Sequence, residues 1–181
     1  MHTLIVGERG VGKSTLIRRV LAELDRPVSG FETKKETALA TEEKGSPVYI
    51  YDAGKPHIHT EENLLGWCKN KRFDSRIEVF DRYAPKLRTP VPAGSIILLD
   101  ELGFMESQAK EFCAAVLELL DGDVPVIAAV KYKDTAFLQA VRSHPKAKCF
   151  WIDAQNRDAL YEEVLPFVKQ QLTQNKEEDH A

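Results

Sequence analysis

One short segment limits what this chain can fold into more than any other feature. Residues 7–14 read Gly-Glu-Arg-Gly-Val-Gly-Lys-Ser and fit the pattern G-x-x-x-x-G-K-[ST]. Glycines in this pattern let the backbone wrap around a phosphate with its N–H groups pointing inward. We call residues 7–14 the phosphate loop. Its predicted phosphate contacts are Gly7, Glu8, Arg9, Gly10, Val11, Gly12, Lys13, Ser14 and the following Thr15.

The segments on either side of the phosphate loop agree with this prediction. Residues 3–6 form an apolar run typical of a strand, and residues 14–24 carry apolar side chains with the period of a helix. Lys13 is predicted to reach the β- and γ-phosphates as a surface loop side chain that adds little packing. The hydroxyl of Ser14 is predicted to hold Mg²⁺. The positive end of the following helix favours the bound phosphates.

The rest of the chain alternates between predicted strands and helices. This order predicts an α/β fold, a single-domain P-loop NTPase with a mainly parallel sheet and helices on both faces. The expected strands are 28–32, 47–51, 95–99, 124–130 and 148–152, and the expected helices are 75–84, 107–120, 134–142 and 156–172. We expect one domain over 1–173, in which 30–90 forms a lid or insert. Residues 174–181 are charged and read as a flexible tail.

Length, charge and composition exclude several classes of protein. A chain of 181 residues, 43% of them hydrophobic, is large enough for one domain with a real core. The net charge of −3 argues against nucleic acid as a partner. No apolar run approaches the about 18 residues that span a bilayer. The three widely spaced cysteines read as buried, reduced thiols, so we expect a cytoplasmic protein without a membrane partner.

A second motif follows the predicted strand at residues 95–99. This apolar run ends in Asp100 and Glu101, and Gly103 completes the pattern D-E-x-G. In a phosphate-loop enzyme a carboxylate at this place contacts Mg²⁺, which assigns Asp100 together with Ser14 to the metal. Glu101 is then predicted to orient or deprotonate the attacking water. The N–H of Gly103 is predicted to face the γ-phosphate.

Arginine and asparagine side chains supply further candidates. Arginine fingers stabilise charge in phosphoryl transfer, and the candidates for this role are Arg9, Arg72, Arg76 and Arg82. Residues 131–134 read Lys-Tyr-Lys-Asp and miss the guanine motif N-K-x-D. Asn156 and Arg157 follow the last predicted strand, where a base edge can bind. Asn156 has the alternative role of capping the last helix.

Five segments in this order resemble the cancer-related nucleoside-triphosphatase family of P-loop NTPases. They are residues 7–15, Gly-Phe-Glu-Thr at 30–33, Val-Phe-Asp-Arg-Tyr-Ala-Pro at 79–85, the strand with D-E-L-G-F-M-E at 96–106, and Asn-Arg-Asp at 156–158. The resemblance implies slow, Mg²⁺-dependent hydrolysis of ATP, GTP and other nucleoside triphosphates to the diphosphate. The chain departs from the family in the polar stretch 34–69 and at Phe104, where a small or basic residue is expected.

Two other functions fit the same scaffold. A small-molecule or nucleotide kinase needs an acceptor pocket, and the middle segment 30–88 is long enough to supply one. A nucleotide-dependent switch or accessory module uses slow hydrolysis only to reset its state. The adjacent Asp100 and Glu101 favour hydrolysis, because an acid beside the metal ligand suits water activation. The protein partner that such a module needs is not named by any motif.

Overall fold

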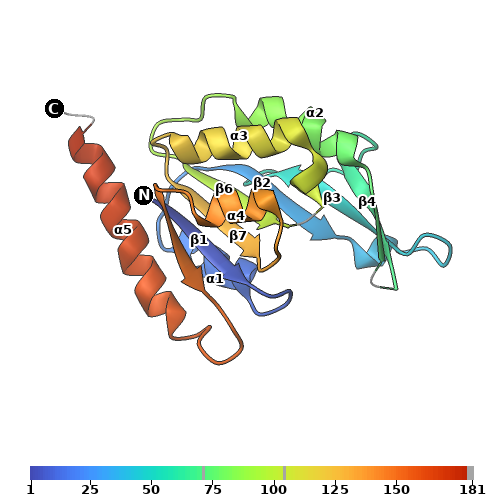
Figure 1. Cartoon of the computed structure of the whole chain (residues 1–181), viewed down its shortest axis with the longest axis horizontal. Helices are drawn as coiled ribbons and strands as arrows, with labels where there is room; N and C mark the ends of the chain where they lie inside the picture. Colours follow the sequence, from blue (N-terminus) through green and yellow to red (C-terminus); the bar gives the residue numbers. More distant parts are fainter. Residues whose placement is uncertain (71, 104, 179–181) are drawn as a thin grey trace.

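The computed structural model describes residues 1–70, 72–103 and 105–178. Phe104 lies outside the described residues, as do 71 and 179–181. The described chain forms one sheet of eight strands in the order β5-β4-β3-β2-β6-β7-β1-β8 (Figure 1). The strand bounds are β1 His2–Gly7, β2 Val28–Lys35, β3 Ser46–Asp52, β4 Leu64–Lys69, β5 Arg72–Ser75, β6 Ile96–Leu102, β7 Val126–Lys131 and β8 Ala147–Trp151.

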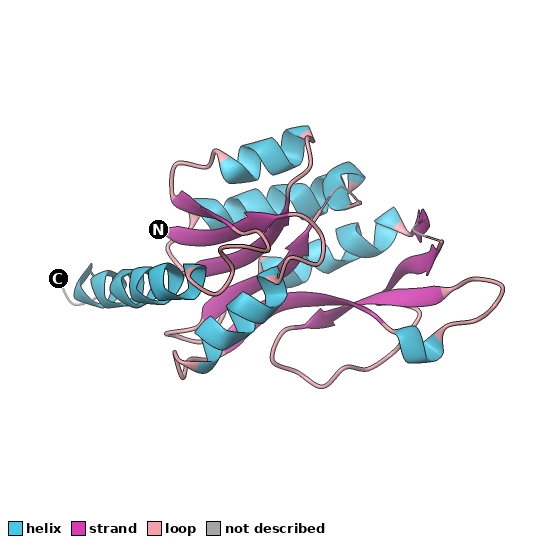
Figure 2. Ribbon diagram, turned by 90° about the horizontal axis from the view of Figure 1, so that it is seen from below, coloured by secondary structure: helices cyan, strands magenta, loops and turns pink. Residues whose placement is uncertain are grey.

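The helices follow the strands as the alternating pattern predicts. The α-helices are α1 Lys13–Ala22, α2 Ile77–Leu87, α3 Lys110–Asp121, α4 Ala136–Arg142 and α5 Leu160–Glu178, with short 3-10 turns at Thr37–Leu39 and Glu106–Gln108. No helix among the described residues is long and apolar enough to cross a bilayer. Figure 2 shows helices on both sides of the sheet, as the sequence predicts.

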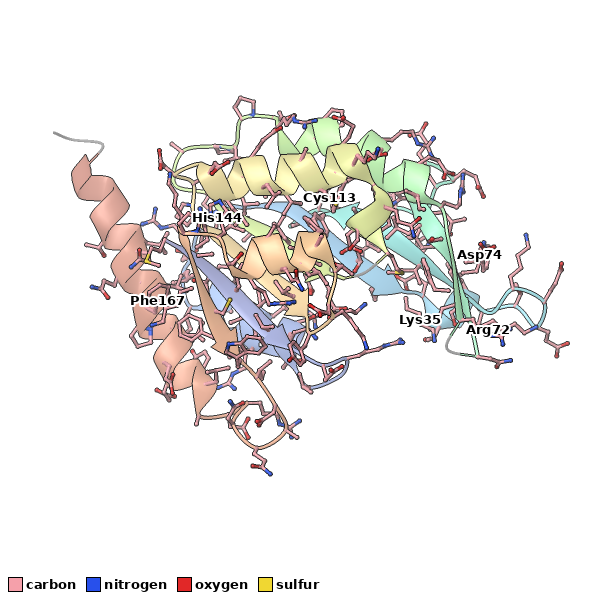
Figure 3. The ribbon with its side chains drawn as sticks, viewed as in Figure 1. Lys35, Arg72, Asp74, Cys113, His144 and Phe167 are labelled. Atoms are coloured by element: carbon pink, nitrogen blue, oxygen red, sulfur yellow. The ribbon has the colours of Figure 1, made fainter. Side chains whose placement is uncertain are left out.

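The two faces of the sheet carry two separate cores. On one face α2, α3 and α4 pack over a core whose ring cluster joins Phe31, Phe80 and Phe112, with ring centroids 5.2–5.4 Å from Phe112. On the other face α1 and α5 pack over Ile5, Leu98 and Ile127. Phe167 of α5 lies 5.3 Å from Phe150 of β8, between ring centroids (Figure 3).

One half of the sheet is parallel and the other half is antiparallel. Strands β2, β6, β7, β1 and β8 pair in parallel. Of these, β1, β6 and β7 are largely apolar and buried, as expected for strands that helices cover on both faces. Strands β3, β4 and β5 pair antiparallel beside β2, and we call them the antiparallel extension. The segment 30–90, expected as a lid or insert, therefore begins inside the sheet and continues it.

Several boundaries differ from the sequence-based expectations. Strands β4 and β5 are not predicted, because β4 is interrupted by Gly66 and β5 is a four-residue edge strand of mixed polarity, so neither carries a clear period. Helix α2 continues through Pro85 to Leu87, since a proline in the last turn removes only one helical hydrogen bond. Helix α5 begins at Leu160 and not at Asn156.

The C-terminal boundary also moves. Helix α5 continues to Glu178, so residues 174–178, expected in a flexible tail, are helical. Gln, Lys and Glu in this segment are good helix formers and extend a helix that is already nucleated. The cysteines Cys68, Cys113 and Cys149 are free thiols, as predicted, but they are half-buried and not fully buried.

Candidate functional site

The phosphate loop connects the end of β1 with the start of α1. Gly12 precedes the first helical residue and has a φ of 110°, which favours glycine. Gly7 must also lack a side chain, because a Cβ there would lie 2.5 Å from the backbone oxygen of Ile152. The first N–H groups of α1 have no acceptor within the helix, so they are available to an anion at this end.

Lys13 is buried, which corrects the expectation of a surface lysine. Lys13 is 3% exposed, and its Nζ donates to the backbone oxygens of Gly7 at 3.0 Å and Glu8 at 2.7 Å. The same Nζ lies 3.0 Å from Oε2 of Glu101. The burial follows from the loop itself, which folds its carbonyl groups around the ammonium. Lys13 thus sits inside the loop, next to the predicted base.

Ser14 and Asp100 meet although 86 positions separate them in the sequence. The Ser14 hydroxyl donates to Oδ1 of Asp100 at 2.8 Å. Both are hard oxygen donors, the kind that Mg²⁺ prefers. Among the described residues, no three His, Cys, Asp or Glu side chains gather as a metal site. The pair therefore fits an ion that takes one or two protein ligands and completes its shell with phosphate and water.

Glu101 lies on the same side as Asp100 because of an irregularity in β6. Successive side chains of a strand normally point to opposite faces. The register between β6 and β7 shifts between Asp100 and Leu102, which leaves Glu101 outside the paired ladder. As a result Asp100 contacts Ser14 and Glu101 contacts Lys13. The two acids thus face the beginning of α1 together.

The two acids are held in different electrostatic states. Burial raises the pKa of Asp100, and the hydrogen bond from Ser14 opposes this shift only in part. Burial would also raise the pKa of Glu101, but Lys131 and Lys13 together bring this pKa below its ordinary value. Lys131 Nζ lies 2.8 Å from Oε1 of Glu101. Glu101 is thus held as a carboxylate between two ammonium groups.

Gly103 is placed near the site, but its N–H already has an acceptor. It donates to Oε1 of Glu106, which is 1% exposed. Burial raises the pKa of Glu106 to about 7, against the hydrogen bonds that its carboxylate accepts. The predicted contact between the Gly103 N–H and a γ-phosphate would therefore compete with Glu106. The side chain of Glu106 instead fixes the backbone that follows β6.

The four candidate arginine fingers lie in different surroundings. Arg9 is exposed in the phosphate loop. Arg76 is paired with Glu61 at 2.9 Å. Arg82 is exposed on α2 and lines a cavity of about 630 Å³ together with Ile50 and Val79. Arg72 lies at the tip of the antiparallel extension, far from β1 and α1 (Figure 3). Only Arg9 belongs to the phosphate loop.

The segment after β8 reaches the phosphate loop. The Cδ of Arg157 lies 3.8 Å from the position that a Cβ of Gly12 would take. Asn156 uses its side-chain amide within its own loop, donating to Trp151 O at 2.8 Å and accepting from Asp153 N at 2.9 Å. This amide therefore shapes the loop in place of capping α5. Among the two candidates, Arg157 is the one beside the phosphate loop.

Four residues near the site are not predicted as site residues. Tyr132 follows β7 and Trp151 is the last residue of β8, on either side of β1. They are 55% and 51% exposed with ring centroids 5.3 Å apart. Lys131 and Glu106 surround Gly103. Trp151 lies in the strand expected over 148–152, and a large aromatic side chain near a strand end is a signal that the sequence does contain. No comparable signal marks Lys131, because its partner is distant in the chain.

Comparison with known proteins supports one family. The chain matches the NTPase family over residues 2–165. It is 29% identical to the nucleoside-triphosphatase THEP1 of Pyrococcus abyssi, covering 97% of both chains. It is 30% identical to the nucleoside-triphosphatase THEP1 of Methanothermobacter thermautotrophicus, covering 93% of this chain and 96% of that relative.

Two solved structures share the fold. The crystal structure of THEP1 from Aquifex aeolicus matches with a TM-score of 0.67 at 24% identity, covering 92% of this chain and 98% of that one. The solution structure of a human cancer-related nucleoside triphosphatase matches with a TM-score of 0.66 at 22% identity, covering 93% and 97%. At these identities the likeness concerns the fold alone.

Proposed function

The chain belongs to the NTPase family, and we propose that it hydrolyses ATP, GTP and other nucleoside triphosphates to the diphosphate and phosphate with Mg²⁺. The observation that carries this proposal is the meeting of two pairs at the phosphate loop. Ser14 bonds Asp100 and Lys13 bonds Glu101, so a metal-binding pair and a base lie side by side at the start of α1. Hydrolysis needs these parts and no acceptor other than water.

Binding of the triphosphate uses the backbone of the loop and the ammonium of Lys13. The N–H groups at the start of α1 bind phosphate oxygens, and Lys13 reaches the β- and γ-phosphates. In the structure Lys13 is occupied by carbonyl oxygens of the loop and by Glu101. We therefore expect the bound phosphates to take over some of these contacts. Arg9 and Arg157 are the cationic side chains placed to add charge from the loop and beside it.

Ser14 and Asp100 would hold Mg²⁺, which supplies neutralisation of the charge that develops on the phosphates. Asp100 is buried, and this burial raises its pKa, whereas a cation bound beside it would favour its ionised form. Ser14 and Asp100 also fix the position of the phosphate tail relative to Glu101. Loss of either side chain should weaken binding of the metal–nucleotide complex.

Glu101 acts on the water in this proposal. A water oxygen attacks the γ-phosphorus, its proton passes to Glu101, and the bond to the β-phosphate oxygen breaks. The products are the diphosphate and inorganic phosphate. The contacts from Lys131 and Lys13 keep Glu101 ionised, which a proton acceptor requires. General-base assistance of this kind contributes about 10²–10⁴-fold.

The base is expected to bind between the ends of β7 and β8. Trp151 and Tyr132 are exposed there, with Arg142 over the ring of Tyr132, and Arg157 lies beside Gly12. Stacking on an aromatic ring tolerates every base, because each base has a π-face. This surface therefore suits an enzyme that accepts several nucleotides. Asn156 would support it by holding the loop that carries Arg157.

One structural observation bears on the kinase alternative. The cavity of about 630 Å³ in the middle segment could receive an acceptor. Its walls include Ile50 and Val79, which belong to the core on the α2 side. Asp100 contacts Ser14 of α1, on the other side of the sheet. The cavity and the Ser14–Asp100 pair therefore lie on different faces of the sheet, which favours water as the acceptor.

The experiment measures phosphate release from ATP, GTP, CTP and UTP, with Mg²⁺ and with EDTA, in the presence and absence of small-molecule acceptors. We expect release from several nucleotides without an acceptor, its loss in EDTA and its return with Mg²⁺. Asp100→Asn should weaken metal–nucleotide binding and slow turnover. If phosphate transfer depends on an added acceptor, the proposed hydrolase function is wrong and the kinase function takes its place. Full activity in excess chelator would remove the metal from the mechanism.

A further inference from the structure

Glu101 is held by two lysines through two different oxygens. Lys13 contacts Oε2 at 3.0 Å, and Lys131 contacts Oε1 at 2.8 Å. Lys13 comes from the phosphate loop, whereas Lys131 ends the neighbouring strand β7. The two contacts are alike in the structure as it stands. They cannot both persist in the same way once a triphosphate binds.

Lys13 already uses its full set of donors. An ammonium has three N–H groups, and Lys13 directs its Nζ at Gly7 O, Glu8 O and Glu101. A contact with the β- or γ-phosphate must therefore replace at least one of these. Glu101 is the only charged acceptor among the three, and a triphosphate offers several negative oxygens in its place. Binding of the nucleotide thus draws Lys13 away from Oε2.

The side chain of Lys131 is held in place by its surroundings. Its backbone pairs with Gly7 of β1, and its side chain is 18% exposed. Its stem lies across Gly103, where an added Cβ would come within 3.1 Å of Lys131 Cδ and 3.3 Å of its Nζ. The missing side chain of Gly103 therefore leaves the room that Lys131 occupies. The Nζ of Lys131 is in this way confined close to Glu101.

We propose that Lys131 is a positioning residue that keeps Glu101 in place by Oε1 while Lys13 moves to the triphosphate. The other oxygen, Oε2, is then released to accept a proton from the attacking water. This inference rests on the proposed function, in which Glu101 handles the water.

The test compares single-turnover hydrolysis and nucleotide affinity for three variants of the full chain. Lys131→Met removes the charge and keeps the length of the side chain, and Lys131→Arg restores a charge with a different shape. Lys133→Met is the matched control, because Lys133 is exposed two positions further on. A misplaced catalytic group can cost about 100-fold, so we expect kcat of Lys131→Met to fall about 10- to 100-fold.

Affinity and the arginine variant separate positioning from binding. Nucleotide affinity of Lys131→Met should change less than about threefold, since the interaction acts only on the transition state. Lys131→Arg should recover part of kcat, and Lys133→Met should behave as wild type. If Lys131→Met weakens nucleotide binding as much as turnover, Lys131 binds substrate and the inference is wrong. Thermal unfolding of each variant shows whether it is folded. If Lys131→Met does not fold, the rate and affinity of Lys131→Arg are compared with wild type instead.

A double variant shows whether Lys131 acts through Glu101. In the Glu101→Gln background, Lys131→Met should change the rate by less than about twofold, because groups that act as a unit are not additive. An equal loss in both backgrounds would overturn the inference and leave the proposed function standing. A wild-type rate for Lys131→Met together with an impaired rate for Glu101→Gln would likewise overturn the inference and leave the proposed function standing. A wild-type rate for Glu101→Gln itself would instead overturn the proposed role of Glu101.

Discussion

The parallel half of the sheet and the antiparallel extension differ both in strand pairing and in how they use their side chains. In the parallel half the carboxyl ends of β1, β6 and β7 meet at one edge, which brings Lys13, Glu101 and Lys131 into contact. In the antiparallel extension neighbouring strands run in opposite directions, so strand ends of one kind do not gather. Groups distant in sequence converge where the strands are parallel.

The polar groups of the antiparallel extension are occupied with one another. The ring of Tyr51 stacks on His57 with centroids 4.0 Å apart, and its hydroxyl donates to Glu36 at 3.0 Å. Asp52 accepts from Tyr83 at 2.7 Å and from Lys86 at 3.0 Å. These contacts connect the extension with its own loop and with α2. The groups proposed for catalysis therefore lie in the parallel half, whereas these contacts of the extension are structural.

The largest expected effect lies at the phosphate loop. Lys13→Ala should lower kcat/KM by about 1,000-fold, the upper range for loss of one charge-stabilising donor. Lys35→Ala, an exposed lysine of β2 at the far end of the sheet in Figure 3, is the matched control and should change little. Steady-state hydrolysis measures both. Equal losses of kcat/KM in the two variants would contradict the proposed difference in function between the two regions.

The pH dependence of stability should have opposite signs at Glu106 and Glu36. Glu106 has a raised pKa of about 7, so its stabilising contribution is full below pH 4.5 and falls as pH rises toward 7. Glu106→Gln keeps an acceptor for Gly103 and should gain stability relative to wild type over this window, by about 3 kcal/mol at most.

Glu36 in the antiparallel extension has a lowered pKa. Burial opposes this shift, but the hydrogen bond from Tyr51 and the contact with Lys34 outweigh it. Its stabilising contribution is present above pH 4.5 and is lost as pH falls below that value. Glu36→Gln should therefore approach wild-type stability in acid. Denaturant unfolding between pH 3 and pH 8 checks both variants, and parallel trends would contradict the assignment.

A smaller effect is expected at the proposed base surface. Trp151→Ala should weaken binding of ATP and GTP about 10-fold, within the range of about 1–3 kcal/mol for stacking on an aromatic ring. Trp151→Phe keeps a ring and should bind nearly as wild type. Quenching of Trp151 fluorescence on nucleotide addition gives a direct readout, with Trp67 of the extension unchanged. Unaltered affinity in Trp151→Ala would place the base elsewhere.

The smallest expected effect concerns Arg82. It is exposed on α2 and lines the cavity on the α2 side of the sheet, opposite Asp100. Arg82→Ala should therefore change kcat less than about twofold, whereas an arginine finger contributes about 10³–10⁵-fold. A loss in that range would show that α2 or its neighbours move onto the nucleotide. Single-turnover hydrolysis decides between the two outcomes.

The sequence by itself determined the parallel half. The apolar run at 3–6, the phosphate loop and the acids Asp100 and Glu101 are local patterns whose chemistry follows from residue type and spacing. The alternation of strands and helices predicts a mainly parallel sheet, and the structure and comparisons confirm it. The antiparallel extension was only partly predicted, because β4, with Gly66 in its middle, and the four-residue β5 lack a clear period.

Only the tertiary structure decided which charges meet. The irregularity in β6 turns Glu101 toward Lys13, and the pairing of β7 with β1 brings Lys131 to the other carboxylate oxygen. The same packing buries Glu106 and leaves Trp151 exposed. These contacts depend on strand order and on one shift of register, which a local pattern cannot encode. A sequence identifies the groups of a site, whereas strand order and register determine which of these groups meet and whether they are held charged or neutral.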